Sequence, residues 1–378
     1  MNLIVVLAGL LLAIVPEAAH AHKPSDSYLS IVAGHSGLRG QWDIALRDLD
    51  YAIGLDADGN GEITWGELRA KHDEIAAYSL ARLSVTADGS KCVLAPRSHL
   101  VDDHSDGAYE VLQFSIDCTG RSPPQEIGVD YQLFFDLDPS HRGLLRIEHA
   151  GASTTAIFGP QRAHQKFVLG EVSRLAQFID YGREGIWHIL IGFDHILFLV
   201  SLLLPAVFVL DSGAWRPAAR FAPVFWDVLR IVTAFTVAHS VTLSLAALSI
   251  VSLPSRLVES TIALSVVLAA LNNLRPIVGG RRWAVAFGFG LIHGFGFASV
   301  LADLGLPRDA LVVALVGFNL GVEAGQLAIV AAFLPLAYAS RRTSAYRRII
   351  FAGGSALIAL VALAWLVERV FLLKLLPG

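Results

Sequence analysis

Apolar residues are distributed differently in the two halves of the chain. Six long apolar stretches follow residue 185, at about 186–210, 228–250, 256–274, 283–301, 310–338 and 349–372. Roughly 20 consecutive apolar residues are enough to cross a bilayer as a helix. The pattern therefore predicts an α-helical polytopic membrane bundle of six spans over residues 186–373.

The first half instead contains short runs in which polar and apolar residues alternate. Ser27–Ala33 and Leu38–Leu46 flank a Gly34-His35-Ser36-Gly37 turn, which is typical of a hairpin. Further short strands are expected at 85–87, 91–94, 109–117, 127–136, 143–149 and 153–158. This spacing predicts a small β-sandwich-like domain over residues 22–160.

Residues 161–185 connect the two halves. Phe167, Val168, Val172 and Leu175 recur at helical spacing among charged residues, which predicts an amphipathic juxtamembrane helix. Four histidines of the β-rich part are interpreted as scattered surface residues: His99, His104, His141 and His149. The pattern indicates no catalytic constellation in this domain.

The N-terminus has the features of a secretory signal peptide. Leu3–Val15 is a short apolar segment, and Ala19-His20-Ala21 is an A-x-A cleavage site, so residues 1–21 would be removed. The β-rich domain would then be extracytoplasmic, where the chain's two cysteines, Cys92 and Cys118, can form a disulfide.

The charges between the spans predict the same orientation. Most of the arginines fall in loops expected on the cytoplasmic side, and only Arg256 and Arg308 fall in loops expected outside. The inner arginines are Arg216, Arg220, Arg275, Arg281, Arg282, Arg341, Arg342, Arg347 and Arg348. With 54% hydrophobic residues, 16% charged residues and a net charge of −4, the composition excludes a purely soluble protein and does not indicate a nucleic-acid partner.

Residues 56–67 fit the EF-hand loop pattern D-x-[DN]-x-[DN]-G-x5-E at every position. Helices are expected on both sides of this loop, at Arg47–Ile53 and Gly66–Leu83, and Gly61 would make its sharp turn. The pattern predicts a structural Ca²⁺ site inserted in the β-rich domain. Its expected ligands are Asp56, Asp58, Asn60, the Glu62 carbonyl, the water-bridged Thr64 and the bidentate Glu67.

Ionisable and amide side chains recur within the predicted spans, where they are costly and usually functional. On one continuous helix, His188, Gly192 and His195 would share a face, with Asp194 beside them. The other polar residues at similar depth are His239, Glu259, His293, Asn319, Glu323 and Gln326. Imidazole and carboxylate ligands suit a first-row ion such as Ni²⁺ or Zn²⁺. The proposed ligands are His188, Asp194, His195, His239, His293 and Glu323. The alternative is a polar core that only joins the helices by hydrogen bonds.

These segments resemble the HupE/UreJ family of bacterial membrane proteins, in its larger branch with an extracytoplasmic domain. The segment from His188 to His195 matches the family's H-P-x-x-G-x-D-H signature in spacing, with Ile189 in place of the proline. His239-Ser240, His293 to Ala298 and Phe318 to Gln326 are also similar. The resemblance covers about 186–340 and implies passage of nickel or a similar divalent ion across the bacterial inner membrane.

Three functions follow from these observations. The first is a divalent-metal permease, in which outer ligands pass the ion to His239, His293 and Glu323. The second is an intramembrane zinc hydrolase acting on a lipid or membrane-anchored substrate, with Glu323 or Glu259 as general base. The third is a structural membrane anchor for the calcium-binding domain. The expected partners are membrane lipids and the metal ion.

Overall fold

The computed structural model describes most of the chain. The described residues are 25–34, 37–104, 107–119, 123–150, 152–170, 173–211, 213–277, 281–296 and 308–371. The predicted signal peptide lies outside them. The chain divides into a β-rich unit containing residues 23–180 and a helical unit containing residues 181–298 and 312–378.

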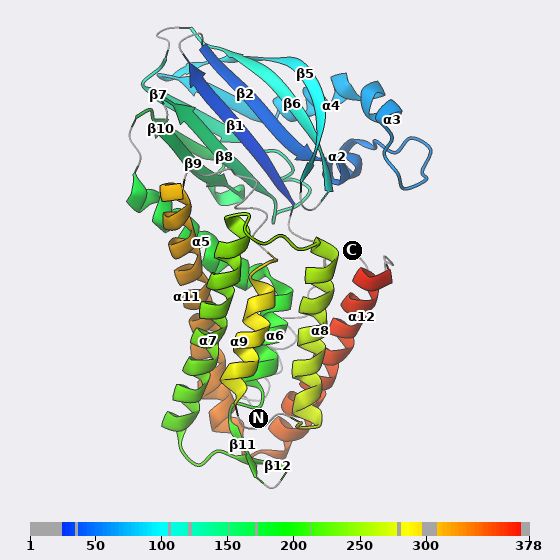
Figure 1. Ribbon diagram of the computed structural model, residues 1–378, viewed down its shortest axis with the longest axis vertical. Helices are drawn as coiled ribbons and strands as arrows, with labels where there is room; N and C mark the ends of the chain where they lie inside the picture. The colour runs from blue at the N-terminus through cyan, green and yellow to red at the C-terminus, as the bar shows by residue number, and fades with distance from the viewer. Residues whose placement is uncertain are drawn as a thin grey trace. The chain divides into compact units, whose positions relative to one another are not determined.

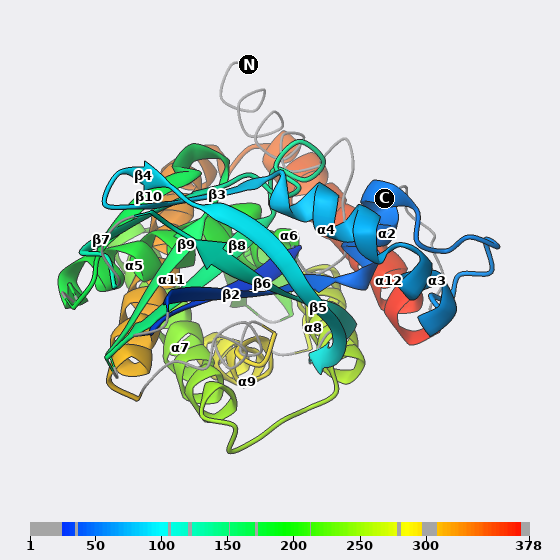
Figure 2. The same cartoon turned by 90° about the horizontal axis from the view of Figure 1, so that it is seen from above.

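Two sheets form the β-rich unit (Figures 1 and 2). The larger has the spatial order β5 (Val93–His104), β6 (Gly107–Asp117), β2 (Gly37–Ala45), β1 (Asp26–Gly34), β8 (Arg142–His149) and β9 (Ala152–Phe158). The smaller has the order β10 (His164–Val168), β7 (Glu126–Tyr131), β3 (Leu83–Ala87) and β4 (Ser90–Lys91). β1 is antiparallel to β2, as the hairpin signal predicted, and parallel to β8.

Side chains of both sheets contribute to one hydrophobic core. Trp42 of β2 lies with its ring centroid 5.3 Å from that of Tyr131 of β7, and both are fully buried. Val85 of β3 and Leu145 of β8 belong to the same buried cluster. Alternating apolar positions therefore bury one face of each sheet, as a layered β structure requires.

Two segments of the β-rich unit differ from the sequence prediction. β5 runs from Val93 to His104, whereas the strand expected there ended at residue 94. Residues 164–168 form strand β10 instead of part of an amphipathic helix, which begins only at Arg174. The physical reason is that Phe167 and Leu169 pack against the core at strand spacing, and β10 pairs along its length with β7.

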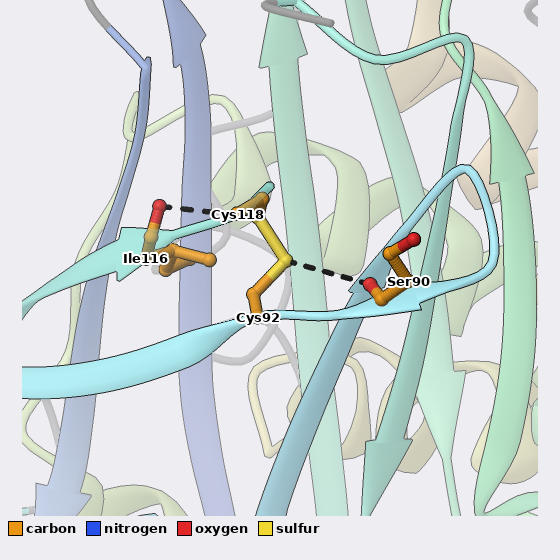
Figure 3. Close-up of a disulfide and its surroundings, with 4 residues drawn as sticks. All are labelled: Ser90, Cys92, Ile116 and Cys118. Carbon is orange, nitrogen blue, oxygen red and sulfur yellow. Dashed lines mark hydrogen bonds between the residues drawn. A yellow bond between two sulfur atoms is a disulfide. The ribbon is translucent and has the colours of Figure 1, made fainter. Parts of the chain in front are cut away.

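Cys92 and Cys118 form a disulfide (Figure 3). Cys92 lies between β4 and β5, and Cys118 follows the end of β6. The bridge therefore joins the chain at one end of the β5–β6 pair, close to the carbonyl groups of Ser90 and Ile116.

The predicted EF-hand segment has helices on both sides. α2 (Leu46–Ile53) precedes the loop, and α3 (Trp65–Ala70) and α4 (His72–Leu80) follow it. The second predicted helix is thus divided at Lys71. Thr64 and Glu67 form a capping box at the start of α3, which satisfies two amide donors that have no partner within the helix.

The helical unit contains broken and continuous helices (Figure 1). They are α5 (Arg174–Ile191), α6 (Phe193–Leu203), α7 (Phe221–Ala247), α8 (Ser255–Leu274), α9 (Arg282–His293), α11 (Arg308–Ser340), the π-helix η2 (Tyr346–Gly353) and α12 (Gly354–Phe371). A hairpin of β11 (Phe208–Asp211) and β12 (Ala214–Pro217) joins α6 to α7.

Four helices of the described residues are long and apolar enough to span a membrane, or five if the bent pair α5–α6 counts as one span. Six spans were predicted. The difference lies at 283–301, where α9 ends at His293 and residues 297–301 are outside the described part. The chain is thus a multi-pass membrane protein with four or five spans among its described residues.

Glycines let two pairs of helices approach closely, as membrane packing favours. A Cβ at Gly185 of α5 would lie 2.0 Å from the carbonyl oxygen of Phe318, and one at Gly321 of α11 would lie 2.0 Å from that of Gly182. Gly290 and Gly294 similarly set the end of α9 against the backbone of α7. These contacts bring α5 to α11 and α9 to α7, the helices that carry most of the polar residues.

Candidate metal centre in the helical unit

The first predicted span is broken at Gly192 rather than continuous. α5 ends at Ile191, α6 begins at Phe193, and their axes are bent by 70°. A Cβ at Gly192 would lie 2.6 Å from the carbonyl oxygen of His188 and 3.1 Å from Nδ1 of His195, so no larger residue fits without a shift. The break places His188 at the end of one helix and Asp194 and His195 at the start of the next.

Histidines from four helices converge at this break. The ring centroid of His195 lies 4.6 Å from that of His188, 5.3 Å from that of His293 and 6.3 Å from that of His239. His188, His195 and His239 each offer a ligand atom, and these atoms lie within 4.8 Å of one another. His195, His239 and His293 are buried. The convergence predicted from depth in the membrane is therefore also a convergence in space.

One nitrogen of each buried imidazole contacts a neighbouring oxygen. Nδ1 of His195 lies 3.1 Å from Oδ1 of Asp194. Nδ1 of His239 lies 3.2 Å from Oδ1 of Asn319, and Nδ1 of His293 lies 2.9 Å from the carbonyl oxygen of Phe289. An oxygen acceptor at Nδ1 fixes the tautomer in which Nδ1 carries the proton and Nε2 carries the lone pair.

The other nitrogen of these rings is available as a ligand. The Nε2 atoms of His195, His239 and His293 are buried and have no hydrogen-bond partner among the described residues. A buried polar atom without a partner costs free energy, which a cation bound to it would recover. Neutral imidazoles held by a second hydrogen bond are the usual form of histidine ligands.

Phenylalanine rings surround the histidines. Phe235 and Phe198 lie 5.2 and 5.0 Å from the His293 ring, and Phe318 lies 5.3 Å from the His188 ring, measured between centroids. These rings exclude water and lower the local dielectric. Electrostatic interactions within the cluster are stronger for that reason.

The predicted carboxylate ligands, Asp194 and Glu323, and the candidate general base, Glu259, occupy different environments. Asp194 contacts the His195 ring and so lies in the cluster. Glu323 accepts a hydrogen bond from the hydroxyl of Thr233 at 2.9 Å, and Glu259 forms an ion pair with Arg369 at 3.2 Å. Glu323 and Glu259 are thus engaged with groups other than the histidines.

Asn319 is a residue of the site that the sequence reasoning did not assign to it. Its amide nitrogen donates to the Leu315 carbonyl at 2.8 Å, which turns its oxygen towards His239. The available signal was its position with Glu323 and Gln326 on one face of α11. Thr233 of α7 donates a hydrogen bond to Glu323, and Thr236 of α7 donates one to Gln326. The polar face of α11 is therefore hydrogen-bonded to α7 at successive turns.

The EF-hand segment forms a separate candidate centre in the β-rich unit. Asp56, Asp58 and Glu67 each offer a carboxylate oxygen, and these oxygens lie within 4.8 Å of one another. The Asp56 carboxylate accepts amide hydrogen bonds from Gly61, Gly59 and Asn60, which lower its pKa. Hydrogen bonds from the side chain and backbone of Thr64 lower the pKa of Glu67 to about 2. Both groups are therefore anionic at neutral pH.

A family model described as HupE / UreJ protein matches residues 163–369. The chain belongs to the HupE/UreJ family. The match covers the helices that carry all four clustered histidines and Asn319. Membership in the HupE/UreJ family, together with the apolar helices, indicates a multi-pass membrane protein of the metal-transporter type. No curated protein matches this HupE/UreJ chain.

Proposed function

We propose that this protein is a permease for a divalent first-row transition ion of the nickel type. In the proposed site, His188, His195, His239 and His293 bind the ion through imidazole nitrogens, and Asp194 supplies negative charge beside them. The observation that carries the proposal is the set of buried Nε2 atoms of His195, His239 and His293, which have no hydrogen-bond partner among the residues that the structure describes. The transported ion is cargo, so the site has to release it.

The composition of the cluster favours release over permanent retention. Its ligands are neutral imidazoles with one nearby carboxylate, and no thiolate is available because both cysteines of the chain form the disulfide. Conduction requires binding that is favourable enough for entry but weak enough for exit. The broken helix supports the same proposal, because discontinuous spans build the substrate and ion sites of many transporters.

The placement of the carboxylates supports transport over hydrolysis. A zinc hydrolase needs a general base within reach of the metal-bound water. Glu323 contacts Thr233 and Glu259 contacts Arg369. The carboxylate that lies in the cluster, Asp194, contacts the His195 ring and serves to orient it.

Uptake by the reconstituted protein tests the transport proposal. We expect proteoliposomes containing the wild-type chain to accumulate radioactive nickel. His195→Ala, His239→Ala and His293→Ala should each lower the initial rate at least tenfold, because each removes a ligand. His164→Ala, at a half-exposed position in the β-rich unit, is the matched control and should retain the wild-type rate. Tight zinc that survives chelator treatment, together with no uptake, would contradict the permease and favour the hydrolase.

Variants of Asn319 test how His239 is positioned. Asn319→Ala removes the acceptor at Nδ1 of His239 and should raise the KM for nickel more than it lowers the maximal rate. Asn319→Asp keeps an acceptor there and should restore most of the affinity. Equal behaviour of the two variants would show that the Nδ1 contact does not orient the ligand.

We also propose that the loop at 56–67 binds Ca²⁺ and that the β-rich unit lies in the periplasm. The calcium ligands are Asp56, Asp58, Asn60, the carbonyl of Glu62, Thr64 and Glu67. Three carboxylate side chains converge there, which suits a hard cation with oxygen ligands. The periplasmic placement is supported by the disulfide and by the basic loops at one end of the bundle.

A further inference from the structure

A second cluster of histidine and carboxylate side chains lies in the β-rich unit, away from the EF-hand carboxylates. His72 is the first residue of α4, His99 lies on β5 and Glu110 lies on β6. Each offers one ligand atom, and the three atoms lie within 4.8 Å of one another. The sequence interpretation of His99 as an isolated surface residue is therefore wrong.

The register of β5 and β6 explains why His99 and Glu110 meet. Glu110 pairs with Val101, and Leu112 pairs with His99, so His99 and Glu110 are diagonal neighbours on one face. This is the face of β6 that carries Leu112 and Phe114 into the core. Glu110 is consequently a carboxylate at an inward position, with no exposed surface.

The triad leaves two buried polar atoms without partners. Oε1 of Glu110 contacts Nδ1 of His99, whereas Oε2 has no hydrogen-bond partner among the described residues. Nε2 of His72 is also buried and has no hydrogen-bond partner among the described residues. The His72 and His99 rings are stacked at 4.2 Å between centroids. A buried carboxylate with one free oxygen is costly unless a cation or donor satisfies it.

We propose that His72, His99 and Glu110 form a binding site for a divalent transition ion such as Zn²⁺. Two imidazoles and one carboxylate are a ligand set that suits first-row divalent ions rather than Ca²⁺. Water can complete the coordination, because the His99 side chain is 12% exposed. The ion would tie α4, the second helix after the calcium loop, to strands β5 and β6.

This site is distinct from the intramembrane cluster and does not require it. Its ligands come only from the β-rich unit, and those of the intramembrane cluster come only from the helical unit. A transition ion here would be retained by the folded unit, whereas the permeant ion has to leave its site. Metal stoichiometry can therefore be assigned to each site separately.

Equilibrium dialysis of the purified full-length chain against Zn²⁺, with Ca²⁺ in excess to occupy the EF-hand, tests the proposal. We expect Glu110→Gln and His72→Ala each to bind one Zn²⁺ fewer per chain than the wild type. Glu110→Gln is isosteric and removes a buried charge, and His72 is only partly buried, so both variants should fold. His164→Ala is the control in the same unit and should bind as many ions as the wild type.

The visible absorption of bound Co²⁺ gives a second readout. Wild-type protein should show ligand-field bands that decrease in Glu110→Gln and persist in His239→Ala, which removes an intramembrane ligand. Unchanged stoichiometry and spectra in both triad variants would overturn this proposal. Full binding by His239→Ala would instead count against the intramembrane site and leave the triad intact.

Discussion

His141 shows how a single buried side chain is held in one protonation state. The hydroxyl of Ser25 donates to Asp48 at 2.7 Å, so its oxygen accepts from Nδ1 of His141 at 2.5 Å. Nε2 of His141 then accepts from the hydroxyl of Tyr131 at 2.6 Å. Burial lowers the pKa of His141 to about 3, and the charge of Arg142 acts in the same direction. The neutral imidazole is therefore part of the folded structure.

This lowered pKa predicts a pH dependence of stability. In the unfolded chain, His141 takes up a proton as the pH falls below about 6.5. In the folded chain, His141 takes up that proton only near pH 3. Stability contributed by the neutral ring should thus be complete above pH 6.5 and decrease as the pH falls. Between pH 6.5 and 4.5, the advantage of wild type over His141→Gln should shrink by about 2 to 3 kcal/mol. Hydrogen exchange of β1 amides in the full-length chain measures this difference.

Tyr131→Phe is the matched control for this prediction. It removes the same hydrogen bond to His141 without removing the titrating group. Its deficit relative to wild type should stay nearly constant over the same pH range. A His141→Gln deficit that is also constant would contradict a neutral buried imidazole.

At the scale of residues, the sequence predicted the identity of polar groups better than their environment. His188, His195, His239 and His293 were recognisable because ionisable side chains are rare in apolar spans. Which ring nitrogen faces Asn319 could not be predicted, since it depends on the contact between α7 and α11. In the β-rich unit, His141 is fully buried and not at the surface as predicted, because its acceptor, Ser25, comes from a segment 116 residues away in the sequence.

The contact between α5 and α11 is set by glycines at the level of whole helices. We expect Gly321→Ala to destabilise the helical unit, because the new Cβ would lie 2.0 Å from the backbone oxygen of Gly182. The clash is with backbone, so the helices α5 and α11 would have to move apart to relieve it. Overpacking of this kind costs about 1 to 3 kcal/mol. The measurement is the thermal melting temperature of the detergent-solubilised chain.

Gly288→Ala is the control for this helix contact. A Cβ at Gly288 of α9 meets no atom of the described part of the chain within 4 Å. Alanine is also the better helix former, so this variant should melt at or slightly above the wild-type temperature. Equal losses in Gly321→Ala and Gly288→Ala would show that the close approach is unimportant.

The EF-hand segment gives a second prediction for an element. Ca²⁺ bound only by the folded chain should raise the melting temperature of wild-type protein, in proportion to the logarithm of its concentration at saturation. Glu67→Gln removes the charged bidentate ligand and should abolish most of this shift. Differential scanning fluorimetry with and without Ca²⁺ measures it.

Glu62→Ala provides the comparison for the calcium loop. Glu62 is expected to bind through its backbone carbonyl, so loss of its side chain should leave the Ca²⁺ shift largely unchanged. A shift that persists in Glu67→Gln, or one that is absent from wild type, would exclude calcium binding by residues 56–67.

At the scale of elements, the sequence predicted whether a segment is a helix or a strand wherever its apolar residues followed a single helical or strand period. The hairpin of β1 and β2, the short helix α2 and the long α7, α8 and α11 follow from alternation or sustained apolar runs. Residues 164–168 contain apolar side chains compatible with both periods, and pairing with β7 decided for a strand. The break at Gly192 could not be predicted from the sequence, because Gly192 lies in an uninterrupted apolar run. Whether a helix bends at such a position depends on the side chains that pack against it.

At the scale of the whole molecule, the helical unit has one basic end. Arg341 donates to the Ala218 carbonyl at 2.8 Å, so the loop after α11 lies against the loop that carries Arg216 and Arg220. At the start of α8, Arg256 instead contacts the carbonyls of Arg369 and Val370 near the end of α12. This segregation agrees with a basic end on the cytoplasmic side.

Thiol labelling of intact cells tests this orientation. In a chain with both native cysteines replaced by serine, Ser252→Cys should react with a membrane-impermeant maleimide, and Ser344→Cys should react only after the membrane is opened. Both positions are exposed, and they lie between predicted spans at opposite predicted sides of the membrane. The reverse labelling pattern would place the β-rich unit in the cytoplasm.

The position of β1 also affects the order in which the chain can mature. β1 lies inside the larger sheet, between β2 and β8, although it precedes every other described strand in the sequence. β8 begins only at Arg142, so β1 keeps an open edge until that late segment arrives. A nascent chain that stalls before residue 142 therefore carries a central strand with one unpaired edge, and we expect it to be a preferred substrate for chaperones and proteases.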